Sequence, residues 1–428
     1  MSLTRRVFLG AGAGVLAQAQ PVAPSDRISV GMIAVGSRSH ELLEAIKKVP
    51  GTEIVGVCDA YSGRVERAIE RTGGRARDYG DYREILADAS IDAVTIGTPD
   101  HWHKQMVLEA FATGKDVYCE KPLTFTIDEG LEIAAAAEKA GKILQVGSQN
   151  ISSDRTARLR EWVRSGKLGQ VTMIRASYNR NSPGGSWIYP IPPDASPETV
   201  DWGAFLGPAP KRKFDLERFF RWRCYKEYSG GIATDLFVHL CTTVHYVMGA
   251  TMPAEAVAMG DLYRWTESRN VPDTLNAMLR YPEGFTVNLS STFNSRAAGG
   301  YLFEVLGTEG SAQVLGRSLI FHPDPGSDSN GWIVSAWPSQ LEAEYYLTPA
   351  GRAERQRRPP FKEEVYLDRG PDATVAHFAD FFSSVRDRKA PIEDAWVGHH
   401  AASCAHLINA SAETGKMMRW DFENHRRA

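Results

Sequence analysis

Residues 117–123, with the sequence VYCEKPL, hold side chains that could move a proton at the edge of a sheet. The apolar start predicts a short buried strand, and Pro122 would end it because proline cannot continue the hydrogen-bonded ladder. Lys121 would then lie at the carboxyl end of a strand, where open α/β sheets bind ligands. An amine that is partly desolvated there and paired with Glu120 could hold or transfer a proton. For this dipeptide alone, a surface ion pair is the simpler interpretation.

A second stretch, residues 228–239, combines two glycines with a carboxylate and an imidazole. The glycines allow close backbone approach where a helix begins. Asp235 and His239 are four residues apart and would share one helix face. On that face they could bind a polyol, orient each other and accept a proton. We therefore expect Lys121, Asp235 and His239 to be catalytic, although an exposed polar pair would explain the spacing of the last two.

The elements that position Lys121 begin with a strand, a turn and a helix. Residues 27–35 form an apolar run, and residues 41–48 carry apolar side chains at helical spacing. The free N–H groups and the dipole of that helix favour a pyrophosphate, so Gly36, Ser37 and Arg38 are expected to bind a cofactor. The next predicted strand ends at Asp59, where an acid can accept hydrogen bonds from an adenosine ribose.

The glycine pattern of this turn is incomplete. A G-x-G-x-x-G register would place glycines at 34, 36 and 39, but the residues are Ala34, Gly36 and Ser39. Small residues still permit the turn, with the phosphate further from the backbone. Strands and helices alternate up to residue 150, which predicts a parallel, doubly wound sheet.

Several motifs together carry a family resemblance. They are TPDHWH at 98–103, EKP at 120–122, VGSQ at 146–149, the 229–239 stretch and HLIN at 406–409. With these motifs in this order, the chain resembles the Gfo/Idh/MocA family of NAD(P)-dependent oxidoreductases. The resemblance implies a Rossmann domain over residues 27–150. It also implies a substrate-binding α+β domain over residues 151–428, with an open, mostly antiparallel sheet flanked by helices.

The resemblance also implies residue roles. Lys121 would lie near the nicotinamide and the substrate hydroxyl, and Asp59 would bind the adenosine ribose. The cofactor cleft would be lined by Thr98, Pro99, His103, Glu120 and Gln149. Asp59 would repel a 2′-phosphate, which favours NAD, whereas Arg64 could shift the preference toward NADP.

The substrate half is rich in aromatic residues and arginines. Aromatic faces beside arginines suit a sugar ring and its hydroxyls. We expect substrate binding by Tyr178, Arg223, Tyr228, Asp235 and His239. For any single aromatic, packing at the base of a long loop is the simpler interpretation. Alternating strands between 255 and 314 predict an antiparallel sheet, whose uncovered face would pair two copies into a homodimer or homotetramer.

Composition narrows the possible partners. The net charge is −3 without a basic block, which argues against nucleic acid. The five cysteines are scattered without a CxxC pair, so we expect buried thiols. Asp100, His101 and His103 could ligate a metal, but no cysteine pair or HExxH helix accompanies them. We therefore expect no metal site, and His101 could face solvent.

The first 26 residues predict export. Residues 4–9, TRRVFL, contain a twin-arginine pattern, and Ala17-Gln18-Ala19 has the form of a cleavage site. The apolar run between them is too short to span a membrane. We expect a periplasmic or otherwise exported protein, the alternative being a frayed basic tail.

The expected activity is oxidation of a secondary hydroxyl of a sugar, polyol or glycoside by hydride transfer to NAD. His239 would be the base, Lys121 would polarise the reacting oxygen, and Asp235 would bind neighbouring hydroxyls or orient His239. One alternative is an NAD-dependent glycoside hydrolase that uses transient oxidation at C3 and elimination. Another is a sugar-binding protein that kept the fold without catalysis.

Overall fold

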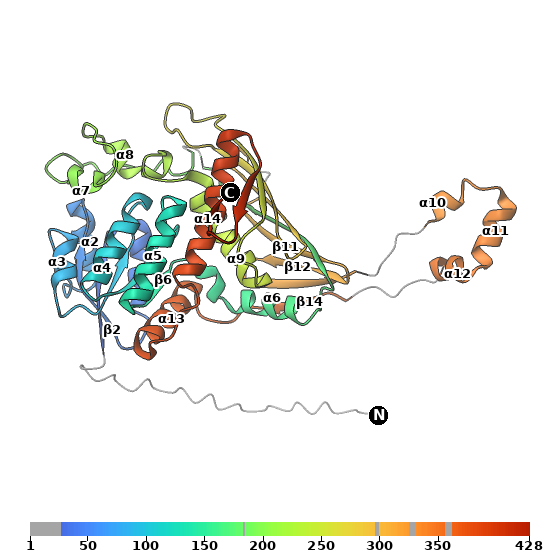
Figure 1. The fold of residues 1–428 in the computed structure, drawn as a ribbon, viewed down its shortest axis with the longest axis horizontal. Helices are drawn as coiled ribbons and strands as arrows, with labels where there is room; N and C mark the ends of the chain where they lie inside the picture. Colours follow the sequence, from blue (N-terminus) through green and yellow to red (C-terminus); the bar gives the residue numbers. More distant parts are fainter. Residues whose placement is uncertain (1–26, 183–184, 296–298, 325–329, 356–361) are drawn as a thin grey trace, which may run out of the picture.

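The computed structural model describes residues 27–182, 185–295, 299–324, 330–355 and 362–428. Two sheets organise this part of the chain, and Figure 1 shows them side by side with helices around the first. The twin-arginine segment lies outside the described residues. Across the described ranges, every helix is too short or too polar to cross a bilayer.

The first sheet has six parallel strands in the order β3-β2-β1-β4-β5-β6. Their bounds are β1 Ile28–Ile33, β2 Thr52–Cys58, β3 Arg77–Asp78, β4 Ala93–Ile96, β5 Asp116–Cys119 and β6 Leu144–Val146. The strands β4, β5 and β6 are buried along their whole length, as expected for a sheet covered on both faces. The predicted doubly wound sheet is confirmed.

Helices from both ends of the chain cover this sheet. The connecting helices are α1 Ser37–Ile46, α2 Ser62–Arg71, α3 Tyr82–Ala87, α4 His103–Ala112 and α5 Ile127–Ala140. They are joined by α13 (Ala373–Asp387), whose phenylalanines are buried with residues of β1 and α1. Tyr118 of β5 stacks on Phe378 of α13 with the ring centroids 4.3 Å apart. Residues far beyond 150 therefore complete the core of the first domain.

The second sheet has ten strands in the order β14-β13-β12-β11-β7-β10-β9-β8-β15-β16. Their bounds are β7 Val171–Tyr178, β8 Glu255–Asp261, β9 Thr274–Arg280, β10 Thr286–Thr292, β11 Tyr301–Gly307, β12 Gly310–Leu315, β13 Ser318–Pro323, β14 Glu364–Leu367, β15 Met418–Asp421 and β16 Arg426–Arg427. Of the pairs between these strands, β7–β10 is parallel and the others are antiparallel. The mostly antiparallel sheet is thus confirmed.

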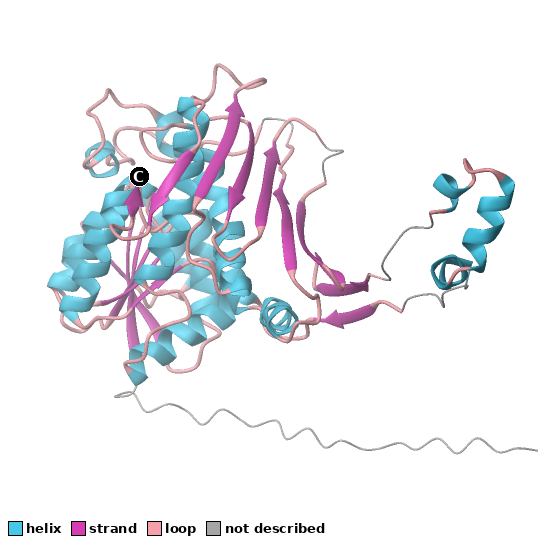
Figure 2. Cartoon of the chain, turned by 45° about the vertical axis from the view of Figure 1, so that its right-hand side comes forward, coloured by secondary structure: helices cyan, strands magenta, loops and turns pink. Residues whose placement is uncertain are grey.

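Helices α6 (Asp154–Arg164), α9 (Val238–Met248) and α14 (Ala395–Thr414) lie on the inner side of this sheet, toward the first domain (Figure 2). The strand β9 shows the resulting alternation, since Leu275, Ala277 and Leu279 are buried whereas Asn276 and Met278 are exposed. Helix α14 contacts α5 of the first domain as well as β8 and α9, so it forms the seam between the domains.

A segment of the second domain also reaches over the carboxyl edge of the first sheet. We call residues 194–222 the roof; it contains α7 (Trp202–Leu206) and α8 (Leu216–Phe220). It is joined to the first domain by a bridge between Tyr61 and Val200 and by the Tyr61 hydroxyl, which donates to the Asp194 carboxylate at 2.7 Å. In Figure 1 the roof lies above α2 and α3.

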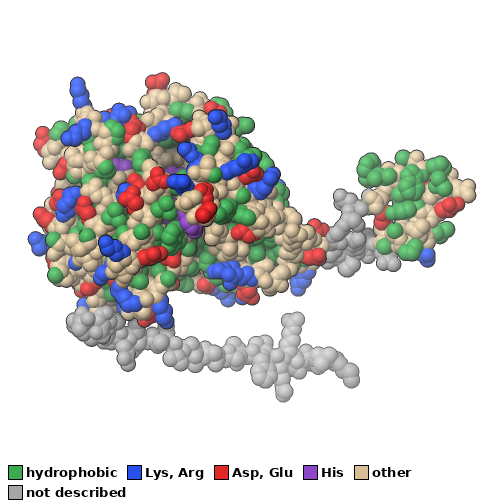
Figure 3. All heavy atoms as spheres, in the orientation of Figure 1, with side chains coloured by type: hydrophobic (Ala, Val, Ile, Leu, Met, Phe, Trp, Pro, Cys, Tyr) green, Lys and Arg blue, Asp and Glu red, His purple; other side chains and the backbone are tan. Residues whose placement is uncertain are grey.

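Between β13 and β14 the chain forms an arm of three helices, α10 Gly331–Val334, α11 Ser339–Leu347 and α12 Pro349–Arg355. The arm projects away from both sheets (Figure 1). Apolar side chains gather on it, as Figure 3 shows, and Trp332 is 78% exposed.

Candidate active site

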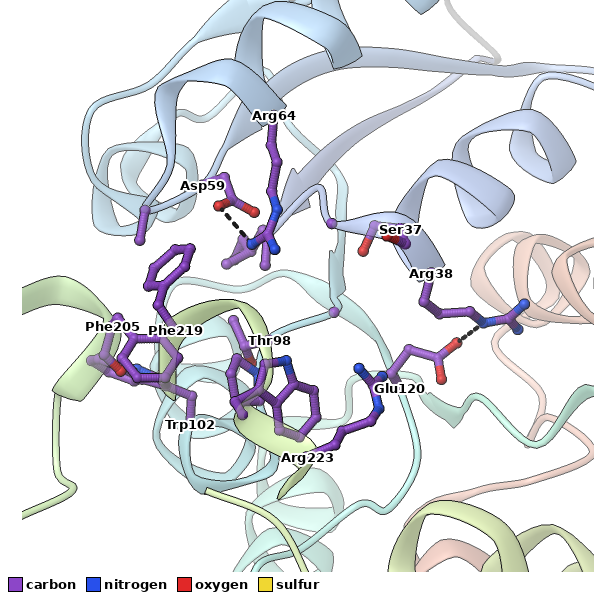
Figure 4. Close-up of a pocket in the computed structure, with 18 of the residues that line it drawn as sticks. Ser37, Arg38, Asp59, Arg64, Thr98, Trp102, Glu120, Phe205, Phe219 and Arg223 are labelled. Carbon is purple, nitrogen blue, oxygen red and sulfur yellow. Dashed lines mark hydrogen bonds and ion pairs between the residues drawn. The ribbon is translucent and has the colours of Figure 1, made fainter. Parts of the chain in front are cut away.

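A cavity of about 550 Å³ runs along the carboxyl edge of the first sheet and is lined from both domains (Figure 4). One end holds the turn after β1 and Asp59 after β2. The other end holds Lys121, Asp235 and His239. The cavity therefore joins the two groups of residues that the sequence singled out.

The turn after β1 exposes the start of α1 to the cavity. Gly36 is the N-cap of this helix and forms no side-chain capping bond, so the first N–H groups stay available to a ligand. Ala34 adopts a left-handed conformation with φ of +62°, which a glycine would adopt without strain. Ser39 stands where the glycine pattern would have its third glycine. Its side chain fits because the residue it faces is Gly97, where a Cβ would lie only 2.2 Å from Ser39 Oγ.

Asp59 is held by the backbone beside this turn. Its carboxylate accepts hydrogen bonds from the N–H groups of Val35 and Tyr61, each at 2.9 Å, and Arg64 Nη1 lies 3.3 Å away. The Arg64 guanidinium lies over the rings of Phe219 and Phe220, at 5.3 and 5.2 Å. These two aromatics of the roof thus lie at the Asp59 end of the cavity (Figure 4 shows Phe219).

His103 is brought close to the cleft but does not line it. Its buried ring bonds the carbonyl oxygens of Pro122 at 2.7 Å and Thr98 at 3.0 Å, so it braces the two loops that do line it. The prediction that His101 faces solvent is wrong. That ring is 7% exposed and bonds the Phe205 carbonyl at 3.1 Å, and burial lowers its pKa to about 4.

The side chains after β5 point to opposite sides, as successive residues of an extended chain do. Glu120 accepts a 2.9 Å bond from Arg38 Nε, whereas Lys121 turns toward the second domain. The expected Glu120–Lys121 pair is therefore wrong. Glu120 instead ties this loop to the turn after β1.

The residues of this cleft fit a dinucleotide. Thr98, Pro99 and Gln149 line it together with the α1 turn, Asp59 and Glu120. Thr98 Oγ1 and Gln149 Oε1 are buried without a hydrogen-bond partner among the described residues, as polar atoms that await a ligand would be.

At the inner end of the cleft, two cations share one carboxylate. Lys121 Nζ donates to Asp235 Oδ1 and to the Asp235 carbonyl, both at 2.9 Å, and Arg223 Nε donates to the same Oδ1 at 3.0 Å. Burial would raise the pKa of Asp235, but Lys121 and Arg223 lower it well below its usual range. Asp235 is therefore an anion at neutral pH.

Asp235 and His239 both line the cavity, although the helix carrying them is irregular. Residues Ala233–Phe237 form a π-helical turn before α9 begins, a distortion often found at functional sites. Burial and the Lys121 ammonium lower the pKa of His239 well below 6.5. The imidazole is thus neutral and can accept a proton.

Two further positions differ from their sequence interpretation. Tyr228 does not reach the cavity, because its side chain is fully buried against His101 and Phe205. Asp100, which the sequence suggested only as a metal ligand, is buried near Lys121 and Asp235, and burial raises its pKa to about 7. The described residues contain no cluster of three or more side chains that could hold a metal ion.

Comparison with known proteins agrees with this geometry. Residues 28–148 match the profile described as "Oxidoreductase family, NAD-binding Rossmann fold", and residues 202–313 match the "GFO/IDH/MocA C-terminal domain". The two matches together cover more than half of the chain. The chain belongs to the Gfo/Idh/MocA family. Its first domain is thus the NAD-binding Rossmann domain of this oxidoreductase family.

Relatives within the Gfo/Idh/MocA family include an inositol 2-dehydrogenase of Salmonella typhimurium, 30% identical over 35% of this chain. That alignment covers 44% of the relative, less than half of its length. A 1,5-anhydro-D-fructose reductase of Ensifer adhaerens is 25% identical over 75% of this chain and 83% of its own. The structure of a levoglucosan dehydrogenase with NADH and levoglucosan has the same fold, with a TM-score of 0.69 and 18% identity over 92% of this chain and 99% of its own.

Proposed function

We propose that this protein oxidises a secondary hydroxyl of a sugar, polyol or glycoside, with NAD as the hydride acceptor. The observation that carries the proposal is the convergence of Lys121, Asp235 and His239 at one end of a cavity whose other end fits a dinucleotide. The named activities of the relatives, on inositol and anhydrofructose, support the substrate class.

Loss of hydride from an alcohol requires that the hydroxyl proton be removed in the same step. NAD, when bound, supplies the hydride acceptor. His239 is neutral and takes the proton. The Lys121 ammonium stabilises the negative charge that develops on the reacting oxygen, and Asp235 holds that ammonium in place through its 2.9 Å bonds. Arg223 and Tyr178 contact the rest of the substrate.

The test is Lys121→Met. This variant keeps the chain length and apolar stem of lysine but loses the charge, so turnover should fall by about 10³-fold. NAD binding, measured by calorimetry, should change little because the cofactor end of the cleft is intact. A variant that keeps wild-type turnover would refute the proposed role.

For the cofactor we propose NAD over NADP. The Asp59 carboxylate lies beside the position proposed for the adenosine ribose, so a 2′-phosphate meets charge repulsion that Arg64 offsets only in part. The ratio of the two dissociation constants tests this preference.

A second candidate is a glycoside hydrolase that oxidises C3 transiently. Oxidation at C3 acidifies the C2 proton, so elimination, water addition and re-reduction give net hydrolysis. The roof supports this candidate because its residues line the cofactor end and it is bridged to the first domain, an arrangement that suits a resident and recycled cofactor. Release of a free sugar without net reduction of NAD would identify the hydrolase. A non-catalytic sugar-binding protein would instead show neither product.

We also propose export through the twin-arginine route and assembly into a homodimer or homotetramer through the second sheet. The outer face of that sheet supports assembly, since Met259 is 75% and Met278 58% exposed. Light scattering of the purified protein and fractionation of cells that carry an Arg5→Lys, Arg6→Lys variant test the two proposals separately.

A further inference from the structure

The substrate end of the cavity carries more positive than negative charge. Lys121, Arg180 and Arg223 line it, and Asp235 is the carboxylate that Lys121 and Arg223 both contact. Both contacts go to one oxygen, Oδ1. The negative charge of Asp235 is therefore shared by two cations, and Arg180 adds a third positive charge.

Arg180 is that third cation. It follows β7, is half-buried, and its guanidinium lies 5.3 Å from the ring of Tyr178. Across the described ranges, no aspartate or glutamate comes within ion-pair distance of it. Its charge nevertheless lowers the pKa of both Asp235 and His239, so the guanidinium acts on the catalytic groups.

Acidic residues elsewhere in the cavity do not restore the balance. The other carboxylates that line the cavity already have partners of their own: Glu41 and Glu120 bond Arg38, Asp59 lies beside Arg64, Asp81 lies beside Arg83, and Asp201 caps α7. Asp100 lies behind the cleft, does not line it, and with a pKa of about 7 is only partly charged at neutral pH. The positive charge of the oxidised nicotinamide would add to the excess.

We infer that the substrate is an acidic sugar whose carboxylate is bound by Arg180, with Arg223 beside it, while its secondary hydroxyl faces Lys121 and His239. Arginine presents a planar fork of donors that matches a carboxylate, and such charge-assisted pairs are strong in a cleft partly removed from water. A neutral sugar would leave Arg180 without an anion. This inference rests on the proposed function and narrows its substrate class to uronic and aldonic acids.

The experiment compares matched pairs of acid and neutral sugars: glucuronate with glucose, galacturonate with galactose, and gluconate with sorbitol. Binding to the NADH-loaded protein is measured by calorimetry and oxidation by NADH formation. We expect at least one acid to exceed its neutral partner by about 10- to 100-fold in affinity and in kcat/KM. Arg180→Gln should remove most of that preference. Arg158→Gln, an equal charge change on α6 outside the cavity, should keep it.

The outcomes separate the two claims. Equal binding of acids and neutral partners, or no binding of any acid, would overturn the inference. Oxidation of the neutral sugars would then leave the proposed function standing. Binding of acids that depends on Arg180, without oxidation of any compound, would support the inference and count against the proposed dehydrogenase.

Discussion

At the scale of single residues, Asp235 opposes the two effects that keep His239 neutral. Its carboxylate raises the pKa of His239, against the larger effects of burial and Lys121. The pKa of His239 lies well below 6.5, so its proposed role as a neutral base predicts that kcat/KM stays constant as the pH falls from about 7.5 to about 6.5. Asp235→Asn should lower kcat by at least about 10²-fold, since Lys121 and Arg223 lose their counter-charge.

The same variant should also move the acidic limb of the pH profile to still lower pH, because it removes the anion that raises the pKa of His239. The measurement is kcat/KM against pH for both proteins. An acidic limb above pH 6.5 that Asp235→Asn leaves unmoved would exclude His239 as the base.

Ala34 stores backbone strain in the cofactor turn. Its φ of +62° is unfavourable for a residue with a Cβ, so Ala34→Gly should raise the free energy of unfolding by about 1 kcal/mol. Equilibrium unfolding in urea measures the change. Ala135→Gly, at an exposed position inside α5, is the matched control. It should lower the free energy of unfolding by about 0.5–1 kcal/mol. If both variants are destabilised equally, the turn carries no strain.

The predicted residues that do line the cavity belong to short local motifs. Lys121 follows a recognisable strand. Asp235 and His239 are four positions apart on one segment, so it could be predicted that their side chains share one helix face. Arg180 and the buried Asp100 come near these residues through tertiary packing, which no local pattern encodes. Tyr228 was misplaced for the converse reason, because an aromatic ring in a segment rich in arginines suggested a sugar site, whereas contacts with His101 and Phe205 bury it.

At the scale of elements, the loop between α13 and α14 supports the turn after β6. Glu393 accepts a 3.0 Å bond from the Ser148 N–H, and its carbonyl accepts another from Val146. Burial raises the pKa of Glu393 to about 8, against the effect of the Ser148 bond. Its contribution to stability is therefore complete below pH 4.5 and is lost as the pH rises toward 8, because the unfolded chain releases this proton first.

Glu393→Gln keeps the shape of the protonated acid without the titration. We expect its melting temperature to match the wild type near pH 5 and to exceed it at pH 8. Glu66→Gln, an exposed carboxylate on α2, should show no such pH-dependent gain. Equal differences at both pH values would mean that Glu393 is ionised in the folded protein.

The periodicity of the sequence predicted most elements, and the alternating strands expected between 255 and 314 coincide with β8 to β12. It did not predict that α13 packs into the core of the first sheet, because a buried helix face has the same pattern wherever it docks. The parallel β7–β10 pair and the roof were also missed, since both depend on pairing between distant segments.

At the scale of the whole molecule, the roof joins the two domains across the cofactor end of the cleft. Phe205 of α7 and Phe219 of α8 line the cavity, so we expect the roof to slow the release of a dinucleotide from this end. Tyr61 helps to attach the roof to the first domain, since its hydroxyl lies 2.7 and 2.9 Å from the two Asp194 carboxylate oxygens. A hydrogen bond to a charged group contributes about 1.5–3 kcal/mol, so Tyr61→Phe should speed NADH dissociation by about 10-fold or more.

The rate can be followed by the fluorescence of bound NADH after mixing with excess NAD. Tyr79→Phe is the matched control, because this equally buried tyrosine donates a 2.7 Å bond to Asp88 away from the cavity. It loses the same type of bond but leaves the roof in place, so its dissociation rate should stay at the wild-type value. Equal rates in all three proteins would show that the roof does not limit cofactor exchange, and this would remove the structural support for a resident, recycled NAD.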